Sequence, residues 1–244
     1  MINLKTVAII QARMGSTRLP GKVLKKLKNK TVLEHVVNRV ADVDIIDQIV
    51  IATSTLPTDD VIEREALGIG AFVYRGDEND VLSRYYEAAV KYNADNIVRI
   101  TSDCPLVDTN VTSDIIRFYL DHNYDYVSNC LVRSYPRGLD TEVFSFGSLE
   151  RAYKEANTPA QREHVTPYIY QNRDKFSVYD YVSEVDLSSY RWTLDTQEDW
   201  DLINKIYDSL YNENTIFNMN QVVALMQQNP WLSEINAHVV QKHL

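Results

Sequence analysis

Short apolar runs that alternate with amphipathic segments constrain the fold of this chain more than any other feature. Five runs rich in β-branched or aromatic residues are typical of buried strands, at 7–10, 49–52, 72–74, 97–100 and 126–128. Segments with helical periodicity lie between them, at 32–40, 60–67, 81–92 and 111–120. This alternation predicts an α/β fold with a mostly parallel sheet and helices on both faces.

The regular alternation of strand-like and helix-like segments ends after Ser128. Strand-like segments follow at 140–146 and 176–182, with helix-like segments at 148–156 and 162–171. A last strand is expected at 191–194, before helices at 196–211 and 219–227. We therefore expect one domain over 1–244, made of an alternating strand–helix half (1–128), a mixed-sheet insertion (129–190), and a return to the core with C-terminal helices (191–244).

The loop after the first strand is built to hold a polyphosphate. Residues 7–24 read VAIIQARMGSTRLPGKVL, so an apolar run stops in a segment with two glycines and several cations and hydroxyls: Arg13, Gly15, Ser16, Thr17, Arg18, Gly21 and Lys22. Glycine lets backbone N–H groups approach phosphate oxygens, and Arg and Lys supply charge. The pattern matches neither the Walker loop nor the dinucleotide fingerprint.

Carboxylates follow two later strands. Asp103 comes just after the strand at 97–100, and Asp195 follows the strand expected at 191–194. Ligands bind beyond the carboxyl ends of strands in open α/β sheets, and Mg²⁺ favours carboxylate and phosphate oxygens. Each aspartate also has an alternative interpretation as a helix or turn cap, because Asp is a favoured N-cap. Four histidines (His35, His122, His238 and His243) show no metal-ligand spacing.

Composition limits the classes of binding partner and the cellular compartment that we expect for this chain. The 244 residues carry a net charge of -9, which argues against a general nucleic-acid binder. Two cysteines, Cys104 and Cys130, make a disulfide framework improbable and indicate a reducing compartment. Neither a signal peptide nor a run of about 20 apolar residues is visible, so we expect no membrane association and a cytoplasmic location.

The motifs together resemble those of sugar cytidylyltransferases. The phosphate loop is followed in order by ATST (52–55), YRGDENDVLSRYYEAA (74–89), IVRITSDCPLVD (97–108), YPRGLDTEVFS (135–145), REHVTPYI (162–169) and RWTLDTQED (191–199). The set is similar to 3-deoxy-manno-octulosonate and acylneuraminate cytidylyltransferases, and more so to the SpsF-like proteins of spore-coat polysaccharide biosynthesis. The resemblance implies a Rossmann-like, three-layer nucleotide-diphospho-sugar transferase fold of the GT-A type, and a homodimer. It also implies that 1–128 is the nucleotide-binding half and that the insertion at 129–190 serves acceptor binding and dimerisation.

The resemblance also implies roles for individual residues. Asp103 and Asp195 would bind Mg²⁺ and, with Arg13 and Lys22, form the catalytic set. The nucleotide site would comprise Gln11, Ala12, Arg13, Gly15, Ser16, Thr17, Arg18, Lys22, Thr53, Asp80, Arg84 and Thr101. The acceptor site would comprise Arg137, Asp140, Glu142, Arg162 and His164. For Asp80, Arg84 and the acceptor residues, ordinary surface or salt-bridge roles remain open alternatives.

The expected activity is therefore transfer of CMP from CTP to an acidic sugar, releasing pyrophosphate, in surface polysaccharide or glycan biosynthesis. A glycosyltransferase would usually carry a D-x-D metal motif where this chain reads SDCP. A non-catalytic nucleotide-binding subunit is a second alternative, against which Arg13, Lys22, Asp103 and Asp195 all argue. The sequence does not identify the sugar.

Overall fold

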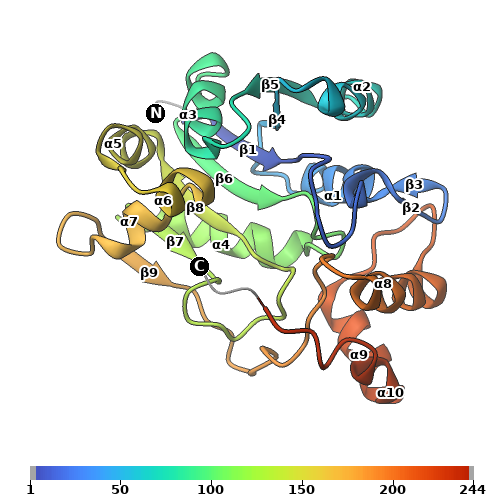
Figure 1. Cartoon of the computed structure of the whole chain (residues 1–244). Coiled ribbons are helices and arrows are strands. Elements are labelled where there is room, and N and C mark those ends of the chain that lie inside the picture. The colour runs from blue at the N-terminus through green and yellow to red at the C-terminus, as the bar shows by residue number, and fades with distance from the viewer. Residues whose placement is uncertain (1–3, 242–244) are drawn as a thin grey trace.

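A seven-stranded mixed sheet forms the centre of the molecule (Figure 1). The computed structural model describes residues 4–241. The strands are β1 (Thr6–Gln11), β4 (Gln48–Ser54), β5 (Phe72–Gly76), β6 (Asn96–Thr101), β7 (Tyr126–Ser128), β8 (Glu142–Ser145) and β9 (Val178–Asp180). Their order is β5-β4-β1-β6-β8-β7-β9, and only β8 runs antiparallel to its neighbours. The predicted mostly parallel sheet is confirmed, and the later strands extend this same sheet.

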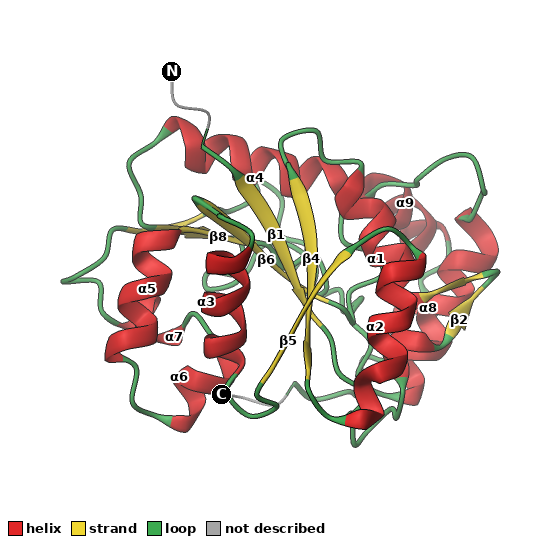
Figure 2. Ribbon diagram, turned by 90° about the horizontal axis from the view of Figure 1, so that it is seen from above, coloured by secondary structure: helices red, strands yellow, loops and turns green. Residues whose placement is uncertain are grey.

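Helices cover both faces of the sheet (Figure 2). One face packs against α1 (Val32–Ala41), α2 (Asp60–Gly68), α4 (Thr109–Asp121), α8 (Gln197–Leu210) and α9 (Met219–Gln228). The other face packs against α3 (Val81–Lys91), α5 (Phe146–Glu155) and α7 (Pro167–Gln171). Alternation along β1 feeds both layers, since Ala8 and Ile10 enter the first core while Val7 and Ile9 enter the second.

Several short elements complete the chain. A hairpin of β2 (Lys26–Leu27) and β3 (Lys30–Thr31) precedes α1, and α10 (Trp231–Glu234) follows α9. Single turns of 3₁₀ helix form η1 (Lys22–Leu24) and η2 (Pro57–Asp59). Within residues 4–241, every helix is too short or too polar to cross a membrane.

The single helix expected at 162–171 is wrong, because the chain forms two helices there. α6 (Pro159–His164) ends at a γ-turn in which Val165 has φ 73° and the Thr166 amide donates to the His164 carbonyl at 2.9 Å. Positive φ is strained for a β-branched residue. Pro167 then starts α7 at a position where its missing N–H leaves no helical bond unmade.

The strand expected at 191–194 is also wrong. Only an isolated bridge joins Arg137 to Arg191 there, and the segment runs beside the 137–139 turn, outside the sheet. The Arg137 amide donates to the Tyr190 carbonyl at 3.0 Å, and the Trp192 amide donates to the Arg137 carbonyl at 2.6 Å. Gly138 makes this approach possible, because it adopts φ 108° and has no Cβ to strike the Trp192 backbone.

Candidate active site

The predicted phosphate loop lies at the carboxyl end of β1 and is held by η2, which is itself bonded to the end of β4. The Met14 amide donates to Asp59 Oδ1 at 2.8 Å, and Asp59 also accepts from the Ser54 hydroxyl at the end of β4. Ser16 Oγ accepts from the Leu19 amide at 3.3 Å. The predicted ligands Gly15, Thr17 and Arg18 lie on the exposed part of this loop. Gly21, with φ 64°, then turns the chain into η1, which begins at Lys22.

The Lys22 ammonium brings together the two predicted metal ligands. Its Nζ lies 2.7 Å from Asp103 Oδ2 and 2.9 Å from Asp195 Oδ1. It also donates to the Leu194 carbonyl at 2.6 Å. The Leu194 amide donates to the Asp103 carbonyl at 2.9 Å, which fixes the two backbone segments side by side. Asp103 and Asp195, which lie 81 and 173 positions after Lys22 in the sequence, thus meet at its ammonium.

Two arginines and a buried aspartate surround Asp195. Arg18 lies 3.1 Å and Arg191 3.0 Å from Asp195 Oδ2. Arg191 is held in turn by Asp199, which is fully buried and accepts from Nε at 2.8 Å and from Nη2 at 2.9 Å. The Asp195 amide also donates to Asp199 at 2.9 Å. Asp199 therefore positions both Arg191 and the Asp195 backbone.

This arrangement keeps the charges of the site fixed. Burial would lower the pKa of Lys22, but Asp103 and Asp195 outweigh burial and raise it. Burial would likewise raise the pKa of Asp195, but the ammonium of Lys22 and the guanidinium of Arg18 lower it. The bond from Arg191 lowers it further. Lys22 is thus cationic and Asp195 anionic at neutral pH.

The capping alternatives are wrong for both aspartates. The N-cap of α8 is Thr196, whose side chain accepts from the Asp199 amide. The N-cap of α4 is Asp108, whose Oδ1 accepts from the Asn110 and Val111 amides at 3.0 Å each. Asp103 and Asp195 instead use their carboxylates on the cations of the site.

The donor set suits a hard divalent cation. Two carboxylate oxygens and one backbone carbonyl converge on a single position, and Mg²⁺ commonly takes one or two carboxylates beside phosphate oxygens. Among residues 4–241, no group of three or more His, Cys, Asp or Glu side chains forms a metal site. The two aspartates therefore fit a metal whose remaining ligands are water and phosphate oxygens.

Polar atoms without partners gather on the α3 face of the sheet. Arg84 is 2% exposed, and two of its three guanidinium nitrogens, Nε and Nη1, lack a partner, as does the buried Oε1 of Gln11. Burial lowers the pKa of Arg84. Arg99 Nε is also buried without a partner. Arg99 lies on β6 two residues before Thr101, which is the strand partner of Gln11. Such atoms are costly unless a ligand or water satisfies them.

Of the other predicted nucleotide residues, Thr53 lies away from this group, while Ala12 and Thr101 already have partners within the protein. Thr53 shares the strand parity of Ile51, so its side chain faces the α1 and α2 layer, opposite Arg84. The Ala12 amide already donates to the Ala52 carbonyl at 3.1 Å. The Thr101 hydroxyl lies 3.2 Å from the Cys104 sulfur. Burial raises the pKa of that thiol, so Cys104 is a neutral packing residue.

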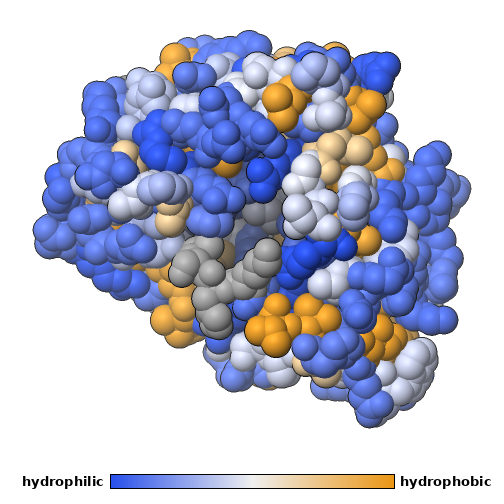
Figure 3. Space-filling model, in the orientation of Figure 1, coloured by the Kyte–Doolittle hydropathy of each residue, from blue (hydrophilic) through white to orange (hydrophobic). Residues whose placement is uncertain are grey.

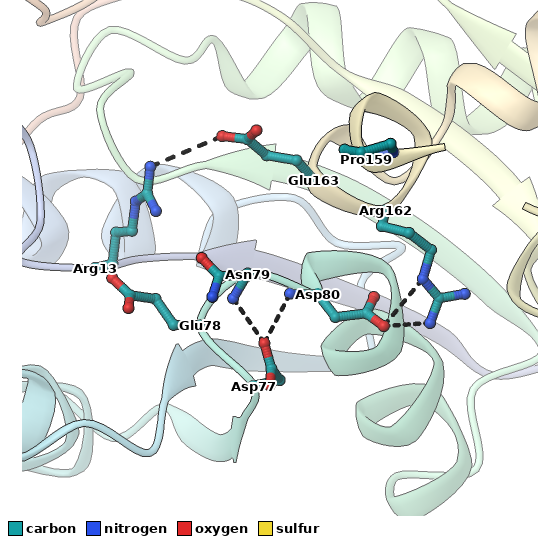
Figure 4. A pocket seen from close by; sticks show the side chains of 8 residues that line it. All are labelled: Arg13, Asp77, Glu78, Asn79, Asp80, Pro159, Arg162 and Glu163. Carbon is teal, nitrogen blue, oxygen red and sulfur yellow. Dashed lines mark hydrogen bonds and ion pairs between the residues drawn. The ribbon is translucent and has the colours of Figure 1, made fainter. Parts of the chain in front are cut away.

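A cavity of about 410 Å³ lies between the phosphate loop and α6 (Figure 4). Arg13 reaches across it to Glu163, at 3.9 Å. On the other side in this view, Arg162 donates to Asp80, which also caps α3 by accepting from the Ser83 amide. The structure thus places Asp80 and Arg162 in one ion pair, and their ligand roles stay predictions. In the view of Figure 1, the surface of the molecule is largely hydrophilic (Figure 3).

The expected acceptor residues divide into structural and available groups. Glu142 is 5% exposed and bonds Arg99, the Tyr126 hydroxyl and the Thr166 hydroxyl, so it is held inside the fold. Asp140 binds Arg133 through two bonds of 2.7 and 3.1 Å. Arg137, in contrast, forms no ion pair with any described residue, and burial lowers its pKa. Burial also lowers the pKa of His164, which lies near Arg13 and Arg99.

Sequence reasoning missed four residues of the site: Asp59, Arg99, Arg191 and Asp199. Arg99 had a usable signal, since it is a lone cation inside the apolar strand IVRIT. The sequence predicts Asp199 at the surface or as a cap; it does accept from the Asp195 and Thr196 amides at the start of α8, but it is fully buried. Of the four other histidines, His35 is buried against the Leu27 carbonyl, His122 and His238 are exposed, and His243 lies outside the described residues.

Comparison with known proteins agrees with this geometry. A family model described as cytidylyltransferase matches residues 7–234. The spore coat polysaccharide biosynthesis protein SpsF of Bacillus subtilis is 33% identical over 91% of this chain and 94% of its own. A 3-deoxy-manno-octulosonate cytidylyltransferase of Trichlorobacter lovleyi is 33% identical over 48% of this chain and 46% of its own. A solved cytidylyltransferase from Leptospira borgpetersenii superimposes with a TM-score of 0.90, at 33% identity, over 98% of this chain and 100% of its own. The chain therefore belongs to the cytidylyltransferase family, as its sequence motifs predicted.

Proposed function

We propose that this protein transfers CMP from CTP to a hydroxyl of an acidic sugar and releases pyrophosphate. The observation that carries the proposal is the convergence of Lys22, from a cation-rich loop, with Asp103 and Asp195 at the carboxyl edge of the sheet. Phosphoryl transfer needs positioning and charge neutralisation more than covalent participation by the protein. This cluster supplies cations that position and neutralise the phosphates, and carboxylates that can hold a metal.

Each residue of the cluster has a defined task in this proposal. Asp103 and Asp195 would hold Mg²⁺, which when bound supplies charge neutralisation on the phosphates. Arg13 and Arg18 are the more exposed cations and would bind the outer phosphates. Lys22 is the least exposed cation of the loop and would contact the α-phosphate, which carries the reacting phosphorus. Arg191 and Asp199 would keep Asp195 oriented throughout.

The unpartnered atoms on the α3 face support a preference for cytosine. The guanidinium of Arg84 offers donors, which suit the O2 and N3 acceptors of cytosine. Uracil carries a hydrogen at N3 and would oppose a second donor there. Gln11 Oε1 offers an acceptor for the 4-amino group that cytosine has and uracil lacks. A buried site that hydrogen-bonds one base strongly rejects another that leaves its atoms unpaired.

Arg137 supports an acidic acceptor. Its guanidinium is half-buried and has no ion pair among residues 4–241, and Arg binds a carboxylate through two parallel bonds. His164 lies near Arg13, so an acceptor that His164 binds would lie beside the phosphate loop. The named relatives act in spore coat polysaccharide biosynthesis and on 3-deoxy-manno-octulosonate, both consistent with such a sugar. The homodimer and the cytoplasmic location stay predictions.

The test is Mg²⁺-dependent pyrophosphate release with each of the four nucleoside triphosphates and a panel of acidic sugars. We expect release that requires CTP and one sugar class. Asp103→Asn should lower turnover by about 100-fold or more, because it removes a charged ligand from the site. Asp174→Asn, at an exposed position, is the matched control and should keep full turnover. Equal turnover in Asp103→Asn and Asp174→Asn would remove Asp103 from the site.

A further inference from the structure

The ammonium of Lys22 lies inside a cage made only of oxygen atoms. Asp103 Oδ2, Asp195 Oδ1 and the Leu194 carbonyl oxygen lie 2.7, 2.9 and 2.6 Å from Nζ. The Lys22 side chain is 11% exposed, so it fills this position and shields it from solvent. These are the oxygens that would otherwise face a divalent cation, because carboxylate and carbonyl oxygens are the ligands of Mg²⁺ and Mn²⁺.

The charges around the cage are already balanced. Lys22, Arg18 and Arg191 face the carboxylates of Asp103, Asp195 and Asp199. A divalent cation that joined this set would stand within a few ångströms of the Lys22 ammonium and share its oxygens. Repulsion between cations at such distances is strong in a partly buried site. The metal and the ammonium therefore compete for one position.

A triphosphate would resolve this competition. Lysine is a compact charge on a flexible four-carbon stem, so its ammonium can turn to a phosphate while its backbone stays in place. The Lys22 backbone is held by a hydrogen bond that its amide donates to the Leu19 carbonyl at 3.2 Å. The phosphates also add negative charge, which offsets the repulsion between the metal and the nearby Lys22 ammonium.

We infer that in the free protein Lys22 occupies the metal position, so that a divalent metal enters only when a nucleotide triphosphate draws the ammonium out. This inference rests on the proposed function, since it takes the nucleotide to be the ligand of the phosphate loop. It makes Lys22 both a phosphate ligand and the group that keeps metal binding dependent on nucleotide. It also predicts an order of binding that the fold alone does not impose.

The test measures metal binding without turnover. Mn²⁺ is titrated into the nucleotide-free protein and its free concentration is followed by electron paramagnetic resonance. Wild type should bind Mn²⁺ weakly, while Lys22→Met should bind at least about tenfold more tightly, because two carboxylates lose their competing cation. Lys26→Met removes an exposed lysine of the same region and should match wild type. Adding Asp103→Asn to Lys22→Met should abolish the gain.

Lys22→Gln serves as a second neutral variant if Lys22→Met does not fold. Wild-type protein that binds Mn²⁺ as tightly as the neutral variant would overturn the inference. Pyrophosphate release by wild type is measured separately with CTP. Release together with tight nucleotide-free Mn²⁺ binding would overturn the exchange and leave the proposed function standing. A tenfold gain in the neutral variant without any CTP-dependent release would overturn the proposed function alone.

Discussion

Gly138 should be the most sensitive glycine of the protein, because the chain that carries Asp195 passes directly over it. A Cβ placed on Gly138 would lie 2.6 Å from the Trp192 carbonyl carbon and 2.7 Å from the Thr193 nitrogen. Both atoms are backbone, so they cannot rotate away as a side chain would. The φ of 108° at Gly138 adds conformational strain for any other residue.

The magnitude follows from these two effects. An unfavourable backbone conformation costs about 1–3 kcal/mol, and overpacking typically costs about 1–3 kcal/mol. We therefore expect Gly138→Ala to lower the free energy of unfolding by about 2–6 kcal/mol. A protein of this size loses roughly 2–4 °C in Tm for each kcal/mol, so Tm should fall by about 4 °C or more. The displaced 192–194 segment should also move the Leu194 carbonyl and Asp195, which lowers turnover in the folded fraction.

Two other glycines separate the effects. Gly70 has φ 79° and open space, with no atom within 4 Å, where a Cβ would lie, so Gly70→Ala reports conformational strain alone and should cost about 1–2 kcal/mol. Gly68 ends α2 in open space, and Gly68→Ala should be neutral or stabilise by up to about 1 kcal/mol. Urea unfolding followed by tryptophan fluorescence, to which the buried Trp192 contributes, measures all three. A Gly138→Ala protein as stable as Gly70→Ala would refute the steric argument.

Two further predictions concern buried groups away from the phosphate loop. Burial lowers the pKa of His35 to about 4 from 6.5, so the neutral ring stabilises the fold above pH 6.5, and this contribution is lost as pH falls toward 4. The loss is about 3 kcal/mol, and unfolding titrations should show a flatter pH dependence for His35→Gln; a profile parallel to wild type would contradict this. Glu142→Gln should lower the free energy of unfolding by roughly 3–5 kcal/mol, because it leaves the Arg99 guanidinium buried without its charge partner. A loss below about 1 kcal/mol, with an acceptor KM that rises instead, would show that Glu142 faces the sugar.

Local sequence patterns determined most of the fold. The parallel strands, their helices and the loop after β1 could be predicted because side-chain periodicity and turn residues act over a few neighbouring positions. The same reasoning placed Asp103 directly after β6, near the phosphate loop, but it placed Asp195 after a strand at 191–194 that the chain does not form. The break at Val165 was missed because a positive φ in a β-branched residue contradicts local preference and is imposed by the packing around it.

Only the tertiary structure decided how the site is assembled. Lys22 meets Asp195 across 173 residues, and Arg162 meets Asp80 across 82, and neither pairing has a local signature. The register of β4 sets Thr53 on the face opposite Arg84, which a motif cannot show. Asp199 fits a capping pattern from its sequence, yet the structure buries it fully beneath Arg191. The sequence determined which groups are present, while long-range packing determined which of them face one another, because contact between distant segments depends on the whole sheet.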